Sequence, residues 1–307
     1  MTRLPQTGWL ADGKRLHLQD GPIDLIVEAT GNENAIRTAY EAAVRRFTGL
    51  LDALCDELPE LRCAARADFS TLQGHVARRM YDAVAPFAAM HFITPMAAVA
   101  GAVAEEVLGA MTAAADVDRA YVNNGGDIAL HLTGGERFTV GLVDNPETPV
   151  LIGRTVIEAG DSVRGVATSG WRGRSFSFGI ADAVTVLART AAQADAAATV
   201  IANAVDLPGH PMIVRHPAND IQPDNDLGGR LVTRGVGKLS HGEIVAALEE
   251  GARIAQVLLA RGLIKGAALH LQGETRIVAL KTFDATVVLP RAPEIGQAGR
   301  PLLAAAI

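Results

Sequence analysis

The chain has 307 residues and a formal net charge of −6, with 49% hydrophobic and 20% charged residues. This composition excludes a disordered chain and predicts a globular protein with a sizeable core. Aromatic residues are few (eight Phe, three Tyr and two Trp). A negative chain with few stacking side chains is not expected to bind nucleic acid.

Two further features bear on the compartment. The amino-terminal segment lacks the apolar core of a secretory signal, and the only cysteines, Cys55 and Cys63, are expected to be reduced core residues. Residues 83–104 carry no charge, but Pro86 and Pro95 interrupt this run. We therefore expect a cytoplasmic protein in which the run forms two buried helices and no membrane span.

The first part of the chain predicts a hairpin followed by helices. The segment RLHLQDGPIDLIVEATG alternates around Asp20-Gly21, as in a β-hairpin. Helical spacing of apolar residues, and a proline that opens the last segment, predict three helices at 33–58, 72–85 and 95–114.

The second part predicts mostly short strands. They are expected at 120–122, 128–132, 137–143, 151–157, within 176–188, at 267–273 and at 275–281. Two helices should begin after the capping residues Thr190 and Ser240. Without regular βαβ alternation, the pattern indicates an α+β fold of antiparallel sheets packed with helices. We expect one domain over 1–290 and a Pro/Gly-rich extension, either an arm or an interface strand, over 291–307.

The segment YVNNGGDIAL, residues 121–130, has two interpretations. Asparagine and glycine between apolar runs favour a tight hairpin turn. The same glycines would also let a ligand approach the backbone, while the amides and Asp127 bind its polar atoms. The segment by itself favours the turn.

The segment GVATSGWRGRS, residues 165–175, offers groups that bind anions. Thr168 and Ser169 supply hydroxyls, the glycines expose N–H groups, and Arg172 and Arg174 follow. An irregular surface loop is an equally good interpretation.

A polar stripe runs along the alanine-rich helix after Thr190. Asp195, Thr199 and Asn203 are four residues apart and share one helical face. A carboxylate and a hydroxyl one turn apart are hard oxygen ligands suited to Mg²⁺. The alternative is that Thr199 bonds a carbonyl of its own helix while Asp195 faces solvent.

The order of these segments resembles a known family. ITPMAAVAGAVAEEVL, AYVNNGGDIAL, FTVGLVDNP, GVATSG and ADAAAT, within residues 90–205, are similar to motifs of the ApbE family of FAD:protein FMN transferases. The chain looks most similar to an uncharacterised soluble branch beside the true ApbE enzymes. The resemblance implies a T-fold-type architecture that binds FAD, with Mg²⁺ at its pyrophosphate, and transfers FMN to a Thr or Ser of a target protein.

The resemblance also implies roles for individual residues. Asp195 and Thr199 would bind Mg²⁺, assisted by a backbone carbonyl within 98–101. The flavin pocket would be lined by Asn124, Gly125, Gly126, Asp127, Thr168, Ser169 and Gly170.

Two motifs of the family are replaced. Ala100-Gly101 stands where the family has Lys-Gly, and a His-His-x-x-Asp-Pro segment is missing, which leaves Asp182 as the candidate catalytic acid. Three functions therefore stay open: a flavin transferase or FAD pyrophosphatase, a different enzyme on the same scaffold for a smaller ligand such as a heterocycle, and a non-catalytic flavin-binding or assembly protein. The third would have a flavoprotein or redox partner, and a homodimer is compatible with all three.

Overall fold

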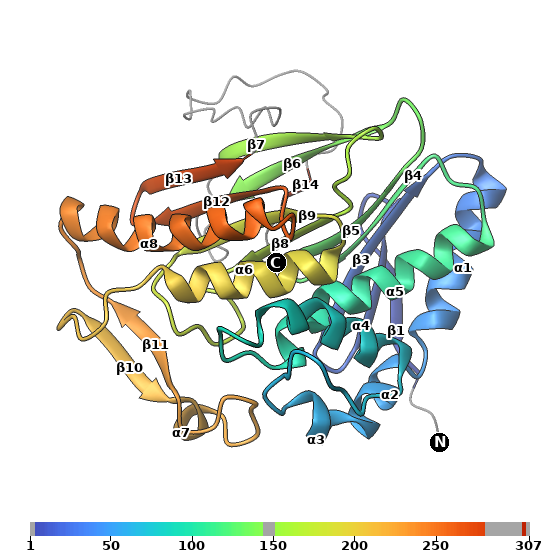
Figure 1. The fold of residues 1–307 in the computed structure, drawn as a ribbon. Helices are drawn as coiled ribbons and strands as arrows, with labels where there is room; N and C mark the ends of the chain where they lie inside the picture. The colour runs from blue at the N-terminus through green and yellow to red at the C-terminus, as the bar shows by residue number, and fades with distance from the viewer. Residues whose placement is uncertain (1–3, 144–150, 280–302, 305–307) are drawn as a thin grey trace.

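The computed structural model describes residues 4–143, 151–279 and 303–304 (Figure 1). Within them, nine antiparallel strands form the central sheet, in the order β1-β2-β3-β4-β5-β8-β9-β12-β13. Their bounds are β1 Gln6–Trp9, β2 Leu16–Asp20, β3 Ile23–Thr30, β4 Arg119–Asn124, β5 Asp127–Leu132, β8 Gly165–Ser169, β9 Ala183–Ala188, β12 Gly266–Leu271 and β13 Glu274–Ala279. The α+β class is thereby confirmed.

Helices cover one face of this sheet (Figure 1). The longer ones are α1 Glu33–Phe47, α4 His75–Val84, α5 Val99–Ala114, α6 Ala191–Ala204 and α8 His241–Ala260. Going along the sheet, α1 packs on β3, α5 on β4 and β5, α6 on β8 and β9, and α8 on β12 and β13. The larger hydrophobic core lies between these helices and the sheet.

A second sheet covers part of the other face. It consists of β6 Arg137–Val143, β7 Leu151–Glu158 and β14 Leu303–Ala304. Alternate residues of the central strands point to the two faces, so Val122 joins the larger core while Tyr121 joins a smaller core against β6 and β7. Because both faces of the sheet are covered here, β4, β5, β8 and β9 are buried along almost their whole length.

The predicted helix over 33–58 is wrong in its length. The chain forms α1, then α2 Leu50–Asp56 and the short α3 Leu58–Leu61. Thr48 is extended and Gly49 has a φ of 76°, which is the left-handed conformation that commonly ends a helix. The apolar spacing continues through this break because all three helices face the same core.

The strand predictions also need correction. Residues 165–169, expected in a loop, form β8, and only the second half of 176–188 forms a strand, β9. The strand β1 and the hairpin of β10 Ile213–Pro217 and β11 Leu231–Val236, with α7 Ala218–Ile221 between its strands, were not predicted. The other expected helices and strands are found, including both capped helices.

Three other expectations concern the cysteines, the uncharged run and the C-terminal extension. Cys55 and Cys63 are free, as expected, but both are exposed. The uncharged run forms the end of α4, two 3-10 turns (Ala85–Phe87 and Pro95–Ala98) and the start of α5. Length and composition alone would let Pro95–Ala114 cross a membrane, yet α5 packs between α1 and α6 on the sheet, as a core helix does. The predicted boundary at residue 290 lies outside the described residues; from the extension, Leu303 and Ala304 pair with β6.

Helices α5 and α6 cap each other where they cross. The N–H of Gly101, in the first turn of α5, donates to Asp195 Oδ2 at 3.0 Å. The N–H of Ala192, in the first turn of α6, donates to Glu105 Oε1 at 2.7 Å. A Cβ on Gly101 would collide with the carbonyl of Ala191, so the crossing requires a glycine at this position.

We expect Gly101→Ala to lower the free energy of unfolding by about 1–3 kcal/mol, since the backbones must separate. Gly109→Ala is the matched control on the same helix, because its Cβ would meet nothing within 4 Å. That substitution should raise stability by about 0.5–1 kcal/mol through helix propensity. Urea unfolding of both variants measures the difference, and equal effects would refute the close approach.

Candidate functional site

The segment Asn123–Asp127 forms the β4–β5 turn. Asn124 pairs with Asp127, and the two glycines between them have φ values of 62° and 106°. Positive φ at both central positions defines a type I′ turn, so the predicted hairpin is confirmed. The Asn123 side chain accepts a hydrogen bond from the N–H of Gly126 at 2.8 Å and holds the turn.

Two carboxylates lie close enough to interact electrostatically beside this turn. Asp127 is buried and accepts a hydrogen bond from the N–H of Thr168 at 3.2 Å. Asp195 reaches from α6 to the backbone of Ala100 and Gly101 at the start of α5. We call Asp127 and Asp195 the carboxylate pair. Asn124 joins the two sides, because its Nδ2 donates to the carbonyl of Ala100 at 3.2 Å.

Both carboxyl groups of the pair have raised pKa values. Burial raises the pKa of Asp195 to about 7, against the lowering effect of the hydrogen bonds from Gly101 and Ala100. The pKa of Asp127 is raised well above its ordinary value, first by burial and then by the negative charge of Asp195. The N–H of Thr168 and the charge of Arg174 act in the opposite direction. Asp195 is half-buried.

The other residues of the predicted stripe have different surroundings. Thr199 is half-buried and lies one helical turn after Asp195 on the same face of α6. Asn203 is used structurally, because its Oδ1 accepts hydrogen bonds from Ser177 Oγ and from the N–H of Phe178. The structure therefore leaves Asp195 and Thr199 together and assigns Asn203 to the adjacent loop.

The side chains of the TSG motif, which is Thr168, Ser169 and Gly170, are divided between the two faces of the sheet. Thr168 Oγ1 lies 2.9 Å from Thr185 Oγ1, across from it on β9, on the side of the smaller core. By strand alternation, Ser169 points to the helix side, as does Ala167. Gly170 packs against the carbonyl of Asp182, where a Cβ would collide. Of the three, Ser169 is placed best to present a hydroxyl on the helix-facing side.

Asp182 belongs to another network. Its Oδ1 accepts hydrogen bonds from Trp171 Nε1 at 3.2 Å and Arg172 Nε at 2.7 Å. Its Oδ2 accepts one from the N–H of Gln272 at 2.6 Å. Asp182 thus braces the loop after the TSG motif against the β12–β13 turn, and its catalytic role stays a prediction.

Asp127 was predicted only as part of the flavin pocket. Its carboxylate comes from a strand and that of Asp195 from a helix, so no local spacing connects the two. The only sequence signal for a role of Asp127 at the site was its position directly after the two glycines of the turn. Among the described residues, no group of three or more His, Cys, Asp or Glu could hold a metal, so a cation would have to use the pair with neutral oxygens.

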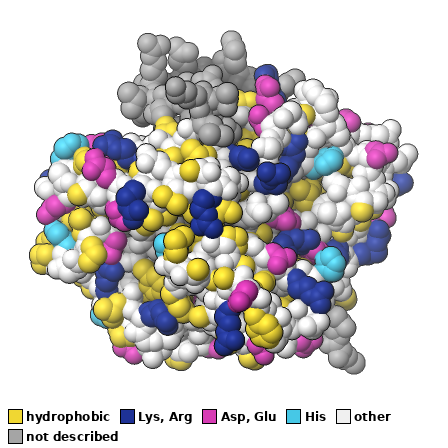
Figure 2. Space-filling model, in the orientation of Figure 1, with side chains coloured by type: hydrophobic (Ala, Val, Ile, Leu, Met, Phe, Trp, Pro, Cys, Tyr) yellow, Lys and Arg dark blue, Asp and Glu magenta, His cyan; other side chains and the backbone are white. Residues whose placement is uncertain are grey.

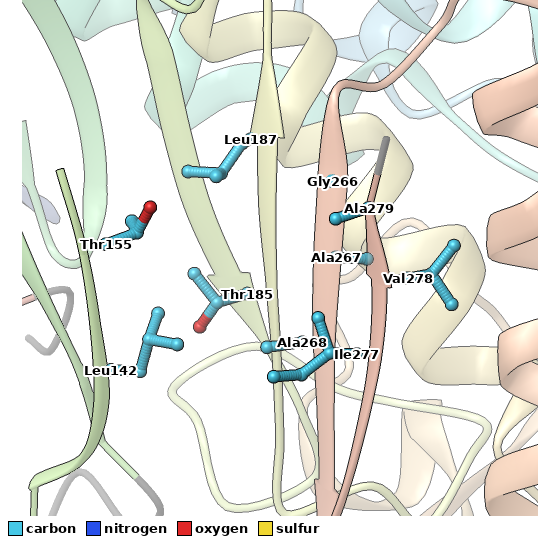
Figure 3. A pocket seen from close by; sticks show the side chains of 10 residues that line it. All are labelled: Leu142, Thr155, Thr185, Leu187, Gly266, Ala267, Ala268, Ile277, Val278 and Ala279. Carbon is cyan, nitrogen blue, oxygen red and sulfur yellow. The ribbon is translucent and has the colours of Figure 1, made fainter. Parts of the chain in front are cut away.

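Two surface features lie apart from the pair. A small apolar cavity between the two sheets is lined by Leu142, Thr155, Thr185 and neighbouring residues of β12 and β13 (Figure 3). The face of the molecule in Figure 2 mixes acidic and basic side chains, with no extended field of one sign. We therefore centre the candidate site on the carboxylate pair.

Comparison with protein families gives a match over most of the chain. A family model described as "AbpE bacteria" matches residues 7–277. The match includes both members of the carboxylate pair, the TSG motif and helices α5 and α6.

Archaeal relatives align with parts of the chain. A UPF0280 protein of Methanopyrus kandleri is 38% identical over 183 residues, which are 59% of this chain and 69% of that protein. A UPF0280 protein of Methanothrix thermoacetophila is 41% identical over 113 residues, 37% of this chain and 46% of that protein. The second alignment therefore spans less than half of its relative.

Solved structures show weaker similarity over a longer span. The flavinyl transferase ApbE of Pseudomonas stutzeri, in its apo form, has a TM-score of 0.40 at 11% identity, over 90% of this chain and 94% of that one. The ApbE protein of Thermotoga maritima has a TM-score of 0.40 at 14% identity, over 91% and 97%. At TM-scores and sequence identities this low, the role of a residue in these structures is not assigned to a residue of this chain.

The raised pKa of Asp195 predicts how stability depends on pH. Between its ordinary value of 3.8 and about 7, the folded protein holds a proton that the unfolded chain releases. The contribution of Asp195 to the free energy of unfolding must then fall as the pH rises through this window. Asp195→Asn removes the charge and keeps an acceptor for the N–H of Gly101.

We expect the variant to equal or approach the wild type near about pH 4 and to be more stable at about pH 8. Urea unfolding in EDTA, which removes divalent cations, measures both. Parallel pH profiles for the two proteins would contradict the raised pKa.

Proposed function

The chain belongs to the family described as AbpE bacteria, and we propose on that basis that it binds FAD or a related nucleotide together with Mg²⁺ at the carboxylate pair. The observation that carries the proposal is the meeting of Asp127 and Asp195 in a buried setting that raises both pKa values. Such a pair is costly when both acids are ionised, and a divalent cation would offset that cost.

The residues around the pair fit the chemistry of Mg²⁺. This ion prefers hard oxygen ligands and is typically bound by one or two carboxylates, with water and substrate phosphates in its other positions. Asp127 and Asp195 would supply the carboxylates. The hydroxyl of Thr199, one turn after Asp195 on α6, and the carbonyl of Ala100 at the start of α5 are candidate neutral ligands. Hydrogen bonds from the start of α5 already orient Asp195.

When bound, Mg²⁺ would polarise the pyrophosphate of the nucleotide. The chain's own residues provide the binding surface. The type I′ turn presents glycine backbone beside Asp127, where a ligand can come close. Ser169 adds a hydroxyl on the helix-facing side of β8, and Asn124 fixes the turn to α5.

The reaction we propose breaks the pyrophosphate bond of FAD. In the transferase form, a hydroxyl of a target protein attacks, FMN is joined to that oxygen, and AMP leaves. In the pyrophosphatase form, water takes the place of the hydroxyl and the products are FMN and AMP. Both forms release AMP, so one assay detects either.

A second candidate is a non-catalytic protein that binds a flavin without transferring it. It is favoured by Asp182, the sole acid between the TSG motif and α6, whose carboxylate is engaged in three hydrogen bonds that brace the loop. An acid held in this way is poorly placed to accept a proton in the reaction.

The test incubates the purified protein with FAD and Mg²⁺ and measures AMP. We expect Asp195→Asn to lower the rate by about 100-fold or more, as expected for loss of a charged metal ligand, and Thr199→Val to lower it less. Asp68→Asn is the matched control. Asp68 is an exposed acid distant in the sequence from both members of the pair, so its substitution should leave the rate unchanged.

Flavin absorbance of the protein after incubation with FAD distinguishes the candidates. Bound flavin without AMP release favours the binding protein. Binding of neither FAD nor a divalent cation would refute the proposal.

A further inference from the structure

The loop after the TSG motif carries two arginines in different situations. Arg172 Nε donates to Asp182 at 2.7 Å, and its guanidinium lies 4.6 Å from the centre of the Trp171 ring. The charge of Arg172 is therefore balanced by a buried carboxylate, and its side chain is fixed by stacking. This arginine holds the loop in place.

Arg174 instead lies on the glycine turn beside the carboxylate pair. Its Nη2 occupies the space where a Cβ of Gly125 would stand, so the guanidinium rests directly on the backbone of the turn. A Cβ at Gly125 would displace the guanidinium from this position, and the φ of 62° at Gly125 independently favours glycine. Arg174 is exposed, so its guanidinium faces solvent at the edge of the site.

The charge of Arg174 acts on the same carboxylates that would bind a cation. Its guanidinium rests on Gly125, two residues from Asp127, so its positive charge lies beside the pair. Arg174 therefore opposes the binding of a divalent cation by itself. Once a cation balances the pair, the guanidinium becomes an uncompensated positive group beside it, suited to an anion.

We propose that Arg174 binds the phosphate groups of the ligand and makes cation and ligand binding mutually dependent. The inference rests on the proposed function, because it takes the pair as the cation site. A guanidinium matches phosphate geometry with two parallel hydrogen bonds, which an ammonium group cannot reproduce. The ligand class is a pyrophosphate or a phosphorylated nucleotide.

The test compares Arg174→Gln and Arg174→Lys with the wild type. Mn²⁺ binding is measured without any anion by electron paramagnetic resonance, and binding of FAD and of inorganic pyrophosphate is measured by calorimetry in saturating Mg²⁺. Arg253→Gln removes an exposed arginine from α8, which is paired with Glu250, and controls for net charge.

We expect Arg174→Gln to bind Mn²⁺ several-fold more tightly and to bind FAD and pyrophosphate about 10- to 100-fold more weakly. Arg174→Lys keeps the charge, so its Mn²⁺ affinity should equal that of the wild type, while its anion affinity falls between the two. Arg253→Gln should match the wild type in all three measurements. Thermal unfolding of each variant verifies the fold.

Each other outcome has a distinct meaning. If the wild type binds Mn²⁺ and FAD but Arg174→Gln binds FAD and pyrophosphate equally well, this inference fails and the proposed function stands. If Arg174→Gln weakens FAD but not pyrophosphate, the arginine contacts another part of the nucleotide and the inference also fails. If the wild type binds neither Mn²⁺ nor FAD, the proposed function fails and this inference with it.

Discussion

The hydrogen bond from the start of α5 to Asp195 is the interaction on which the site depends. It places a carboxylate from α6 against the backbone of Gly101. In the opposite direction, Glu105 of α5 accepts a hydrogen bond from an N–H in the first turn of α6. Each helix thus satisfies backbone N–H groups of the other, which would otherwise lack partners. The arrangement also carries Asp195 to the β4–β5 turn, where Asp127 is already buried.

Small residues make this arrangement possible. Gly101 lets the backbones of α5 and α6 approach, and the alanines of α6 are nearly all buried without bulky side chains to separate the helices. A carboxylate held in so close a crossing loses much of its hydration, which raises its pKa. The packing of two helices is therefore the physical cause of the unusual acidity of the site.

The central sheet places members of the predicted flavin pocket on different faces. Alternation sends the side chain of Thr168 to the smaller core, where it meets Thr185, and leaves Ser169 on the helix side. Asp182 then braces the loop that follows, so that Arg172 is fixed and Arg174 lies on the glycine turn. The loop's position thus follows from its hydrogen bonds to Asp182, which is bonded in turn to the β12–β13 turn, distant in the sequence.

The sequence by itself determined the elements with local signals. Helical spacing placed Asp195 and Thr199 on one face, Thr190 and Ser240 marked their helices, and paired glycines marked the β4–β5 turn. The order of motifs identified the family. Tertiary structure alone decided that residues 165–169 form a buried strand and that Asp127 is the partner of Asp195. The physical reason is that sequence spacing shows which residues share one face of a helix or strand. Which charged side chain from another element lies against that face depends on how elements distant in the sequence pack together.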